Sequence, residues 1–430
     1  MATGARAPVV TGPTIDSVNG TTEGAGSGTR VLCVFLDAPV GASTGSVRWR
    51  RLARYVCSRG TATVVVVHRT APDDLVMLAA ELGADVLALD VARDGRGRGV
   101  VRALAMPWRS WPPARTDVGA ARQAIARQLG GSDPEVIWCA GPEAWLALPK
   151  GLRRRAVVDL IDLPSRNRRE LARVAMHRLG RRITHDGGVD ASVFALARDV
   201  QGGIRNRWVE RHVARRAAAA VVASPTEVHG HGGLHCVRTG VDDPGAVQPP
   251  ADRHAVPHFV FPGSFLYPPH QDAAEWFVLY VLPPLRRLLP ACQVVFAGEC
   301  PDWMRSFGQL HGIEVTGPLD DMGDVLDGRS VVIAPIRAGS GTIVEVIDAW
   351  ARGVPVVATS RGVEGLDAQD GDDVLVADDP AEFAARCSMA ARYPDLRARL
   401  AANGRARYEA EFTWPGIGAD LLAWLPTLDG

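Results

Sequence analysis

Hydrophobic and polar positions are arranged along the chain in blocks that predict parallel strands joined by helices. Short apolar runs, typical of buried strands, lie at 30–36, 63–67, 85–89, 135–139 and 156–161. A second series of such runs lies at 258–261, 293–297, 331–334 and 354–358. Each run is followed by a longer helical or irregular segment, and this alternation is typical of α/β folds. The pattern therefore predicts an α/β protein with two Rossmann-like, doubly wound domains.

The length of the chain also indicates two domains, because 430 residues are many for one hydrophobic core. Residues 1–28 contain few large apolar side chains and are predicted to form a disordered tail. The expected divisions that follow are a first domain at 29–242, a linker rich in Pro, Asp and Gly at 243–257, a second domain at 258–412 and a C-terminal helix at 413–430.

The stretch 331–366 predicts one strand–loop–helix–strand unit of the second sheet. Its helix is expected to end at Gly353, which suits the left-handed position after a helix. The turn before the helix contains Gly339, Ser340, Gly341 and Thr342. Ligands of such sheets bind beyond the carboxyl ends of the strands, where loop amides and a helix N-terminus hold anions. Asp348, one helical turn further on, could accept hydrogen bonds from two sugar hydroxyls; an ordinary turn with a solvated Asp stays open.

The overall charge and cysteine content exclude several classes of protein. Lys plus Arg and Asp plus Glu both number 48, which argues against a nucleic-acid binder that relies on overall charge. Seven cysteines without a C-x-x-C suit a reducing cytoplasm and predict neither a disulfide framework nor a metal site. Neither a signal-peptide core nor an apolar run of membrane-spanning length is present, so a cytoplasmic protein is predicted.

Positive charge is concentrated in one segment, because residues 150–216 contain 17 Lys or Arg against 7 Asp or Glu. This segment either forms a solvated face or meets anionic headgroups or a phosphorylated acceptor, so peripheral membrane contact stays open. Lys150 is the only lysine of the chain, so a cationic phosphate contact has to come almost entirely from arginine.

Three motifs in the stretch 331–366 resemble the nucleotide-binding signature of retaining GT-B glycosyltransferases of family 4. They are R-A-G-S-G-T, D-A-W-A-R-G-V-P-V-V-A-T and G-V-E-G-L, and the similarity extends over most of residues 30–414. The resemblance implies that the second domain holds a nucleotide-diphosphate sugar and the first an acceptor. It also implies retention of anomeric configuration, no required metal or cofactor, and a C-terminal helix that crosses back to the first domain.

The expected pattern of the nearest branch, G-S-G-T-R-x-K-x-L-E-A, is not fully kept. Ile343 stands for the Arg, Glu345 for the Lys and Asp348 for the Glu. Ser340 occupies the first Glu position of the E-x7-E pair found in the wider family. Because the missing Arg and Lys are the expected partners of the diphosphate, we predict that Arg337 and Arg48 replace them.

In the first domain, the resemblance points to two loops. Residues 38–48 are predicted to form a loop that opens into a helix at about 47–59. They match the family's S-G-G-R-x-R only at Gly45 and Arg48, and because that motif faces the donor phosphates and the acceptor, the resemblance assigns Gly45 to the acceptor and Arg48 to catalysis; a plain βα turn stays open. The sequence D-L-I-D-L-P-S at 159–165 resembles the D-x-x-D-x-x-S of the family. Asp162 is therefore predicted to be a catalytic base or acceptor contact, or else a loop carboxylate paired with an arginine. Ser165 is predicted to cap the next helix and to lie at the acceptor site.

The second domain opens with a segment that resembles the family's G-S-x-x-Y-P-P-N-x-D-A-x-x-W-F. Gly263, Ser264 and Phe265 begin this segment and are predicted to contact the donor. Residues 315–321, V-T-G-P-L-D-D, resemble the loop that frames the nucleotide base in the family, which assigns Gly317 to the donor as well. A simple Pro/Gly turn is an equally good interpretation of that loop.

Together these observations predict a glycosyltransferase that moves a sugar from a GDP- or UDP-linked donor to a small molecule of specialised metabolism, including a thiol. Two alternatives stay open: a non-catalytic relative that binds sugar nucleotides, and an enzyme for lipid-linked or polysaccharide acceptors. No nucleic-acid partner is predicted, and a homodimer is left open.

Overall fold

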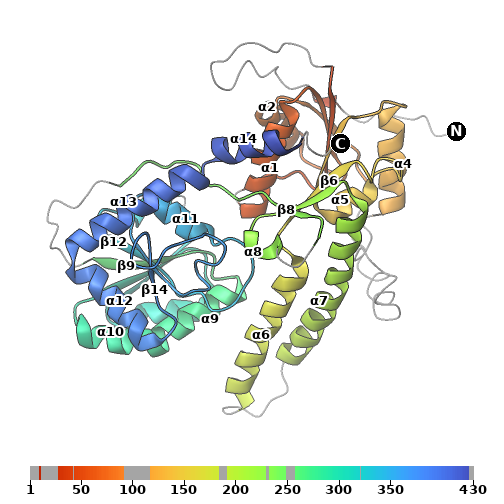
Figure 1. Ribbon diagram of the computed structural model, residues 1–430. Helices are drawn as coiled ribbons and strands as arrows, with labels where there is room; N and C mark the ends of the chain where they lie inside the picture. Colours follow the sequence, from red (N-terminus) through yellow and green to blue (C-terminus); the bar gives the residue numbers. More distant parts are fainter. Residues whose placement is uncertain are drawn as a thin grey trace. The chain divides into compact units, whose positions relative to one another are not determined.

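The computed structural model describes residues 9–10, 28–41, 43–91, 117–183, 191–228, 232–247, 257–319 and 321–425. It divides into two compact units, each built from separate stretches of the chain (Figure 1). Unit 1 comprises Met1–Ser165, Gln201–Val237 and Gly418–Gly430. Unit 2 comprises Arg166–Val200 and Arg238–Ile417.

Unit 1 contains an eight-stranded sheet with the order β1-β4-β3-β2-β5-β6-β7-β8. Its strands are β1 (Val9–Val10), β2 (Arg30–Phe35), β3 (Thr61–Val66), β4 (Asp85–Ala88), β5 (Val136–Ala140), β6 (Ala156–Ile161), β7 (Ala219–Val222) and β8 (Leu234–Cys236). All neighbours pair in parallel except β1, which is antiparallel to β4. β1 lies within the segment expected to be a disordered tail, so that expectation is wrong for these two residues.

The helices of the first half of the chain connect these strands. They are α1 (Thr44–Cys57), α2 (Pro72–Leu82), α4 (Val118–Leu129), α5 (Gly141–Ala147), α6 (Pro164–Ile183), α7 (Ala191–Arg216) and α8 (Pro225–Val228). One hydrophobic cluster joins alternate residues of β2, such as Leu32 and Val34, to Trp145 of α5 and Val213 of α7. This period of two identifies strands that are covered on a face by helices.

Unit 2 contains a six-stranded parallel sheet with the order β11-β10-β9-β12-β13-β14. Its strands are β9 (His258–Pro262), β10 (Gln293–Ala297), β11 (Ile313–Gly317), β12 (Ser330–Ala334), β13 (Val356–Ala358) and β14 (Leu375–Val376). The chain runs outward from β9 to β11 and then continues on the other side of β9 with β12. The junction of β9 and β12 is therefore the topological switch point of the sheet.

Helices cover both faces of this sheet (Figure 1). They are α9 (Pro268–Trp276), α10 (Leu282–Leu288), α11 (Val344–Ala351), α12 (Pro380–Arg392) and α13 (Pro394–Glu411), with a π-helical turn, η1 (Phe277–Val281), between α9 and α10. Phe259 and Phe261 of β9 pack with α9, α10 and α12, whereas Val260 packs with α11 and α13. Both faces are apolar because both are buried, as expected for a parallel sheet.

The last helix, α14 (Trp414–Trp424), is divided between the two units at Ile417 and Gly418. Within unit 1, a Cβ on Gly418 would lie 2.4 Å from the ring of Tyr55, so only glycine fits this contact. The ring of Trp424 stacks on His235 with centroids 4.2 Å apart. Residues 418–424 are therefore an integral part of unit 1.

The fold class predicted from the apolar pattern is confirmed, because both units contain parallel α/β sheets. The predicted strand–loop–helix–strand unit is also confirmed as β12, α11 and β13, and Gly353 follows α11 with φ 65°. The start of α1 was misplaced, because the helix begins at Thr44 with Ser43 as its N-cap. Gly45 therefore lies in a helix and not in the predicted loop, and Arg48 lies one turn into that helix.

Candidate functional site

Three glycines line the carboxyl ends of three neighbouring strands in unit 2. Gly263 follows β9 with φ 142°, Gly298 follows β10 with φ 137°, and Gly317 ends β11 with φ 77°. A Cβ on Gly298 would lie 2.1 Å from the carbonyl oxygen of Gly263, and Gly298 forms a bridge to Gly317. Because side chains are absent here, the strand ends present bare backbone to a ligand that approaches the sheet edge.

The loop between β12 and α11 lies at the switch point beside this glycine row. Gly339 and Gly341 have φ values of 118° and 94°. A Cβ on Gly339 would lie 3.5 Å from both Pro269 and the Tyr267 hydroxyl, which brings the loop against the segment after β9. Helix α11 begins without a side-chain cap, and the Val346 amide donates to the Ile343 carbonyl at 3.2 Å, so the amides of Val344 and Glu345 are left for another acceptor.

Ser340 adds a second sign that a partner is missing from this loop. Its Oγ atom is buried and has no hydrogen-bond partner among the described residues. A buried hydroxyl without a partner costs about 1–3 kcal/mol, so this position favours a ligand that supplies an acceptor or donor. Thr342 lies in the same loop and is partly exposed.

Arg337 lies directly ahead of the loop but is engaged by neighbouring side chains. Its Nη2 donates to the Asp272 carboxylate at 2.7 Å, and its guanidinium lies 5.5 Å from the ring centre of Trp276. The side chain remains 28% exposed, so part of the guanidinium is accessible. These contacts hold the cation beside the loop with little conformational freedom.

Arg361 is a residue of this site to which the sequence analysis assigned no role. It follows β13, donates to the carbonyl oxygen of Gly339, and pairs with Glu364. Arg361 and Glu364 both lie in the stretch 331–366, but their spacing in the sequence does not indicate that Arg361 contacts the Gly339 loop. Arg361 therefore stabilises the loop conformation through its backbone.

Asp348 lies on α11 as predicted, within an ionic network. Its carboxylate accepts from Arg352 Nε at 3.0 Å, and Arg352 Nη2 donates to Asp321 at 3.1 Å. Burial raises the pKa of the Asp348 carboxyl above its ordinary value, although Arg352 opposes this effect. The side chain is 27% exposed, so a ligand can still reach it.

Ser264 and Phe265, two of the predicted donor residues after β9, have different environments. Ser264 is exposed and its carbonyl accepts from His270 Nδ1 at 3.1 Å. Phe265 is fully buried against Phe261 and Phe296. Its side chain belongs to the core, so any contact of Phe265 with the donor would have to come from its backbone.

The prediction that Arg48 reaches the donor phosphates is also wrong, since its guanidinium is occupied inside unit 1. Arg48 is fully buried on α1, with Nε 3.1 Å from one Asp159 oxygen and Nη2 3.2 Å from the other. Its Nη1 donates to the Val237 carbonyl at 2.8 Å. Arg48 therefore joins α1 to β6 and to the end of the segment that contains β8.

Gly45 and Asp162 are brought to the same region of unit 1. A Cβ on Gly45 would lie 3.1 Å from Ile161, the residue before Asp162. Ile161 has φ 62°, which is rare for a β-branched side chain, and such strain is concentrated at functional sites. Asp162 follows β6 as predicted and is partly buried.

Ser165 does not have the environment that was predicted for it. Helix α6 begins at Pro164, so Ser165 is inside the first turn and is not the cap. Its Oγ and its amide both lie 2.6 Å from the Glu210 carboxylate, and the residue is 2% exposed. Ser165 therefore connects α6 to α7, and an acceptor contact through this hydroxyl is excluded in this conformation.

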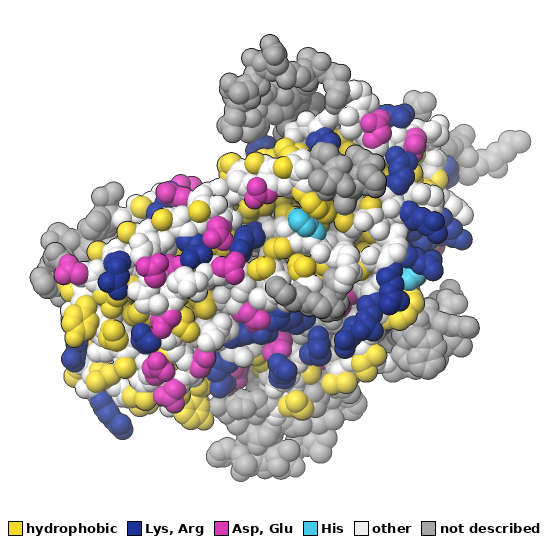
Figure 2. Space-filling model, viewed as in Figure 1, with side chains coloured by type: hydrophobic (Ala, Val, Ile, Leu, Met, Phe, Trp, Pro, Cys, Tyr) yellow, Lys and Arg dark blue, Asp and Glu magenta, His cyan; other side chains and the backbone are white. Residues whose placement is uncertain are grey.

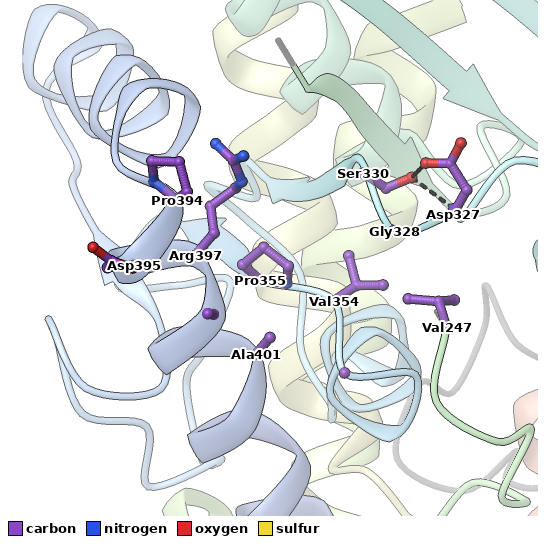
Figure 3. Close-up of a pocket in the computed structure, with 12 residues that line it drawn as sticks. Val247, Asp327, Gly328, Ser330, Val354, Pro355, Pro394, Asp395, Arg397 and Ala401 are labelled. Atoms are coloured by element: carbon purple, nitrogen blue, oxygen red, sulfur yellow. Dashed lines mark hydrogen bonds between the residues drawn. The ribbon is translucent and has the colours of Figure 1, made fainter. Parts of the chain in front are cut away.

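A separate cavity of about 480 Å³ lies in unit 2 at the amino ends of β12 and β13, opposite to the strand ends that carry the glycine loop (Figure 3). Ser330, at the start of β12, and Pro355, just before β13, line it together with Pro394 and Arg397 of α13. Arg397 is buried and donates to the carbonyl oxygens at the end of α12. Because this cavity lies at the amino ends of the strands, it is not the predicted donor site.

The basic segment 150–216 contributes several ion pairs. Arg155 pairs with Asp133, and Arg168 with Asp199. Figure 2 shows Lys and Arg side chains close together on the visible face over unit 1. Among the described residues, no helix combines the length and apolarity needed to cross a membrane.

Known proteins resemble this chain in the sequence of its second unit and in the fold. Residues 256–392 match the family model of glycosyl transferases group 1, and no curated protein matches the chain by sequence. The solved structure of TarM is similar with a TM-score of 0.65 and 9% identity, covering 94% of this chain and 99% of that chain.

Two further solved structures have the same fold. Sucrose-phosphate synthase from Thermosynechococcus elongatus has a TM-score of 0.61 at 14% identity, covering 93% of this chain and 99% of that chain. Anabaena HepE, solved with UDP and glucose, has a TM-score of 0.57 at 14% identity, covering 93% of this chain and 100% of that chain. The protein therefore has the GT-B fold, and its second unit carries the match to the glycosyl transferases group 1 model.

Proposed function

We propose that unit 2 binds a nucleotide-diphosphate sugar at its switch-point loop and that the protein transfers the sugar with retention of configuration. The observation that carries this proposal is the loop Gly339–Thr342, which joins free helix-terminal amides to the unbonded hydroxyl of Ser340. Gly317, at the end of β11, leaves room for the nucleotide, because a Cβ there would meet nothing within 4 Å. UDP is the favoured carrier, because the similar Anabaena HepE was solved with UDP.

In this proposal the protein accelerates transfer by stabilising charge on the departing diphosphate. Donors fixed before the reaction stabilise such a charge without reorganisation, and they act most strongly in the transition state. The amides of the loop, the N-terminus of α11 and the exposed part of Arg337 are the donors available in unit 2. Asp348 is assigned to the ribose hydroxyls and Asp162 to the acceptor or to proton transfer.

The acceptor is proposed to be a small molecule of specialised metabolism, such as a thiol or alcohol of an antibiotic pathway. The departures from the family 4 pattern at Ile343 and Glu345 support a specialised enzyme. A relative that binds the nucleotide without transfer is the second candidate, because those same departures remove two cations. Donor hydrolysis or transfer by purified protein distinguishes the two.

A thermal-shift panel of UDP, GDP, ADP and dTDP tests the donor assignment. A nucleotide at 100 times its dissociation constant should stabilise unit 2 by about 2.7 kcal/mol. For a unit of this size, that corresponds to a rise in melting temperature of about 5–11 °C. A panel in which every nucleotide leaves the melting temperature unchanged would remove the donor site from this loop.

Ser340→Ala sharpens this experiment, because the buried hydroxyl has no partner without ligand. The variant should melt at the same or a higher temperature than the wild type without nucleotide, yet gain less from nucleotide. Ser388→Ala, at a buried serine on α12, is the matched control and should keep the full nucleotide-induced shift. Equal shifts in both variants would contradict a contact between Ser340 and the ligand.

A further inference from the structure

The cavity at the amino ends of β12 and β13 is a second concave site in unit 2 (Figure 3). Its volume of about 480 Å³ lies within the range of about 300–1,000 Å³ that is usual for small-molecule pockets. The switch-point loop, to which the nucleotide is assigned, follows the carboxyl end of β12. The cavity is therefore a separate site, which the proposed function does not use.

Apolar side chains form most of the cavity wall. They come from the linker, from the segment before β13 and from α13, and they are Val247, Val354, Pro355, Pro394, Ala398 and Ala401. Figure 3 shows α13 on one side of the cavity and Val247 on the other, with Pro355 and Val354 between them.

The backbone of this wall is fixed by hydrogen bonds to the helix and the sheet. The amide of Val354 donates to the Ala349 carbonyl of α11 at 2.8 Å, and the Pro355 carbonyl accepts from Val332 of β12 at 2.9 Å. The amide of Val247 donates to the Arg352 carbonyl at 2.8 Å. The site is thus formed before a ligand arrives, and a preformed site binds with a small cost in conformational entropy.

The polar side chains of the wall already have hydrogen-bond partners within unit 2. Ser330 is 1% exposed, and its Oγ lies 3.0 Å from Nε2 of His258. The Asp327 carboxylate accepts from the amide and the guanidinium of Arg329 at 2.8 and 3.2 Å. Arg397 donates to two carbonyl oxygens at the end of α12. A charged ligand would lose its hydration in the cavity and find these groups engaged, which is unfavourable.

The volume and the apolar wall together select an uncharged molecule with rings. An engineered apolar cavity of about 150 Å³ binds benzene, and this cavity has roughly three times that volume, so it has room for about two or three rings. Removal of the apolar surface of the rings from water supplies the affinity. A rigid ring system also loses less conformational freedom on binding than a flexible chain of the same size.

We propose that this cavity binds an uncharged aromatic molecule of two or three rings, and that it does so while the nucleotide occupies the switch-point loop. The ligand lies between the segment that joins α11 to β13 and the first turns of α13. Its recognition depends on shape and apolar contact and does not use charge. The inference is independent of the donor assignment, so either can fail without the other.

Fluorescence titration of the full-length protein with N-phenyl-1-naphthylamine, an uncharged probe with three rings, tests the proposal. We expect saturable binding at a single site. The probe 8-anilino-1-naphthalenesulfonate has the same rings and an added negative charge, so it should bind about tenfold more weakly or worse. Saturating UDP should leave the affinity for the uncharged probe unchanged, because the two sites lie at opposite ends of the strands.

Two substitutions on α13 fill the cavity and leave the switch-point loop untouched. Ala401→Trp and Ala398→Phe each place a ring in the space that the probe needs, and each should weaken its binding about tenfold or more. Ala402→Trp, at an exposed position of the same helix, is the matched control and should keep the wild-type affinity. A cooperative thermal melt of each variant verifies that it is folded.

Hydrogen exchange of the wild type locates the probe without any substitution. The amides of Gly353, Val354 and residues 397–401 should exchange more slowly when the probe is bound, because its contacts hold these segments closed. The amides of residues 339–342 should exchange at an unchanged rate. These data decide the location even where a filled variant does not fold.

Absence of saturable binding, or equal affinity for the sulfonated probe, would overturn the inference. Binding that persists in both filled variants, or protection confined to residues 339–342, would overturn the cavity as the site. Displacement of the probe by UDP would assign it to the switch-point loop and would also overturn the inference. None of these outcomes removes the donor assignment, which the thermal-shift panel of nucleotides tests separately.

Discussion

Replacing Arg48 by methionine removes the cation from a fully buried ion pair in unit 1. The guanidinium donates to both oxygens of Asp159 at 3.1–3.3 Å and to the Val237 carbonyl at 2.8 Å. After the substitution, the Asp159 carboxylate stays buried and keeps the backbone amide of Ile161, at 3.0 Å. Removal of one partner of a buried pair typically costs about 3–5 kcal/mol, so we expect a loss of this size from the free energy of unfolding of unit 1.

Differential scanning calorimetry measures this loss. For a unit of this size, each kcal/mol shifts the melting temperature by about 2–4 °C, so the transition of unit 1 should fall by about 6–20 °C. A nucleotide that binds unit 2 identifies the other transition, which should stay in place. Arg30→Met is the matched control, because its pair with Glu135 is exposed and 3.9 Å long, and should cost less than about 1 kcal/mol.

The double variant Arg48→Met with Asp159→Leu tests whether the unpaired Asp159 carboxylate causes the loss of stability. Because an apolar pair of similar volume can replace a buried ion pair at little cost, the double variant should melt well above the single variant. A single variant that melts like the wild type but no longer transfers sugar would refute this reasoning. That result would indicate that the Arg48 guanidinium contacts the substrate, as the sequence pattern alone predicted.

Three other variants test the site in unit 2. Gly298→Ala should destabilise unit 2 by about 3–5 kcal/mol, because Gly298 has a positive φ and its Cβ would lie 2.1 Å from a backbone oxygen. The control Gly371→Ala, where φ is 79° and no atom lies near the new Cβ, should cost about 1–2 kcal/mol in the same thermal melts. Asp348→Ala should weaken nucleotide binding by about 1.5–3 kcal/mol in calorimetry, and unchanged affinity would remove its ribose assignment. Because burial raises the Asp348 pKa, acidification should protonate this carboxylate and weaken binding at a higher pH than an ordinary Asp would. Arg361→Ala, which frees the Gly339 carbonyl, should lower nucleotide affinity about tenfold, and wild-type affinity would show that the loop needs no such support.

Local patterns in the sequence predicted the parts of the structure that local physics determines. Apolar runs of strand length marked β9, β10 and β12, because both faces of a parallel sheet are buried. Gly353 marked the end of α11, because a left-handed residue is needed there and glycine adopts it without a steric cost.

Residues whose role depends on a distant partner were not predicted. Arg48 matched a family motif, yet its environment is set by Asp159, which is 111 residues away. Ser165 matched a capping pattern, but its hydroxyl donates a hydrogen bond to the buried carboxylate of Glu210. The pairing of His270 with Glu345 could not be foreseen either, since only the fold brings the ends of β9 and β12 together.

The division of α14 between the two units has a consequence for protein engineering. Because Gly418 and Trp424 pack against Tyr55 and His235, residues 418–424 belong to the first unit although they follow the second unit in the sequence. A hybrid that exchanges the stretch Arg238–Ile417 between homologues should therefore carry crossover points near residues 238 and 417, and exchange of the whole of unit 2 needs two more, near residues 166 and 200. A hybrid with a single crossover would pair the foreign C-terminal segment with the native Tyr55 surface. Recombination within such genes is thus constrained by a short segment of unit 1 that follows unit 2 in the sequence.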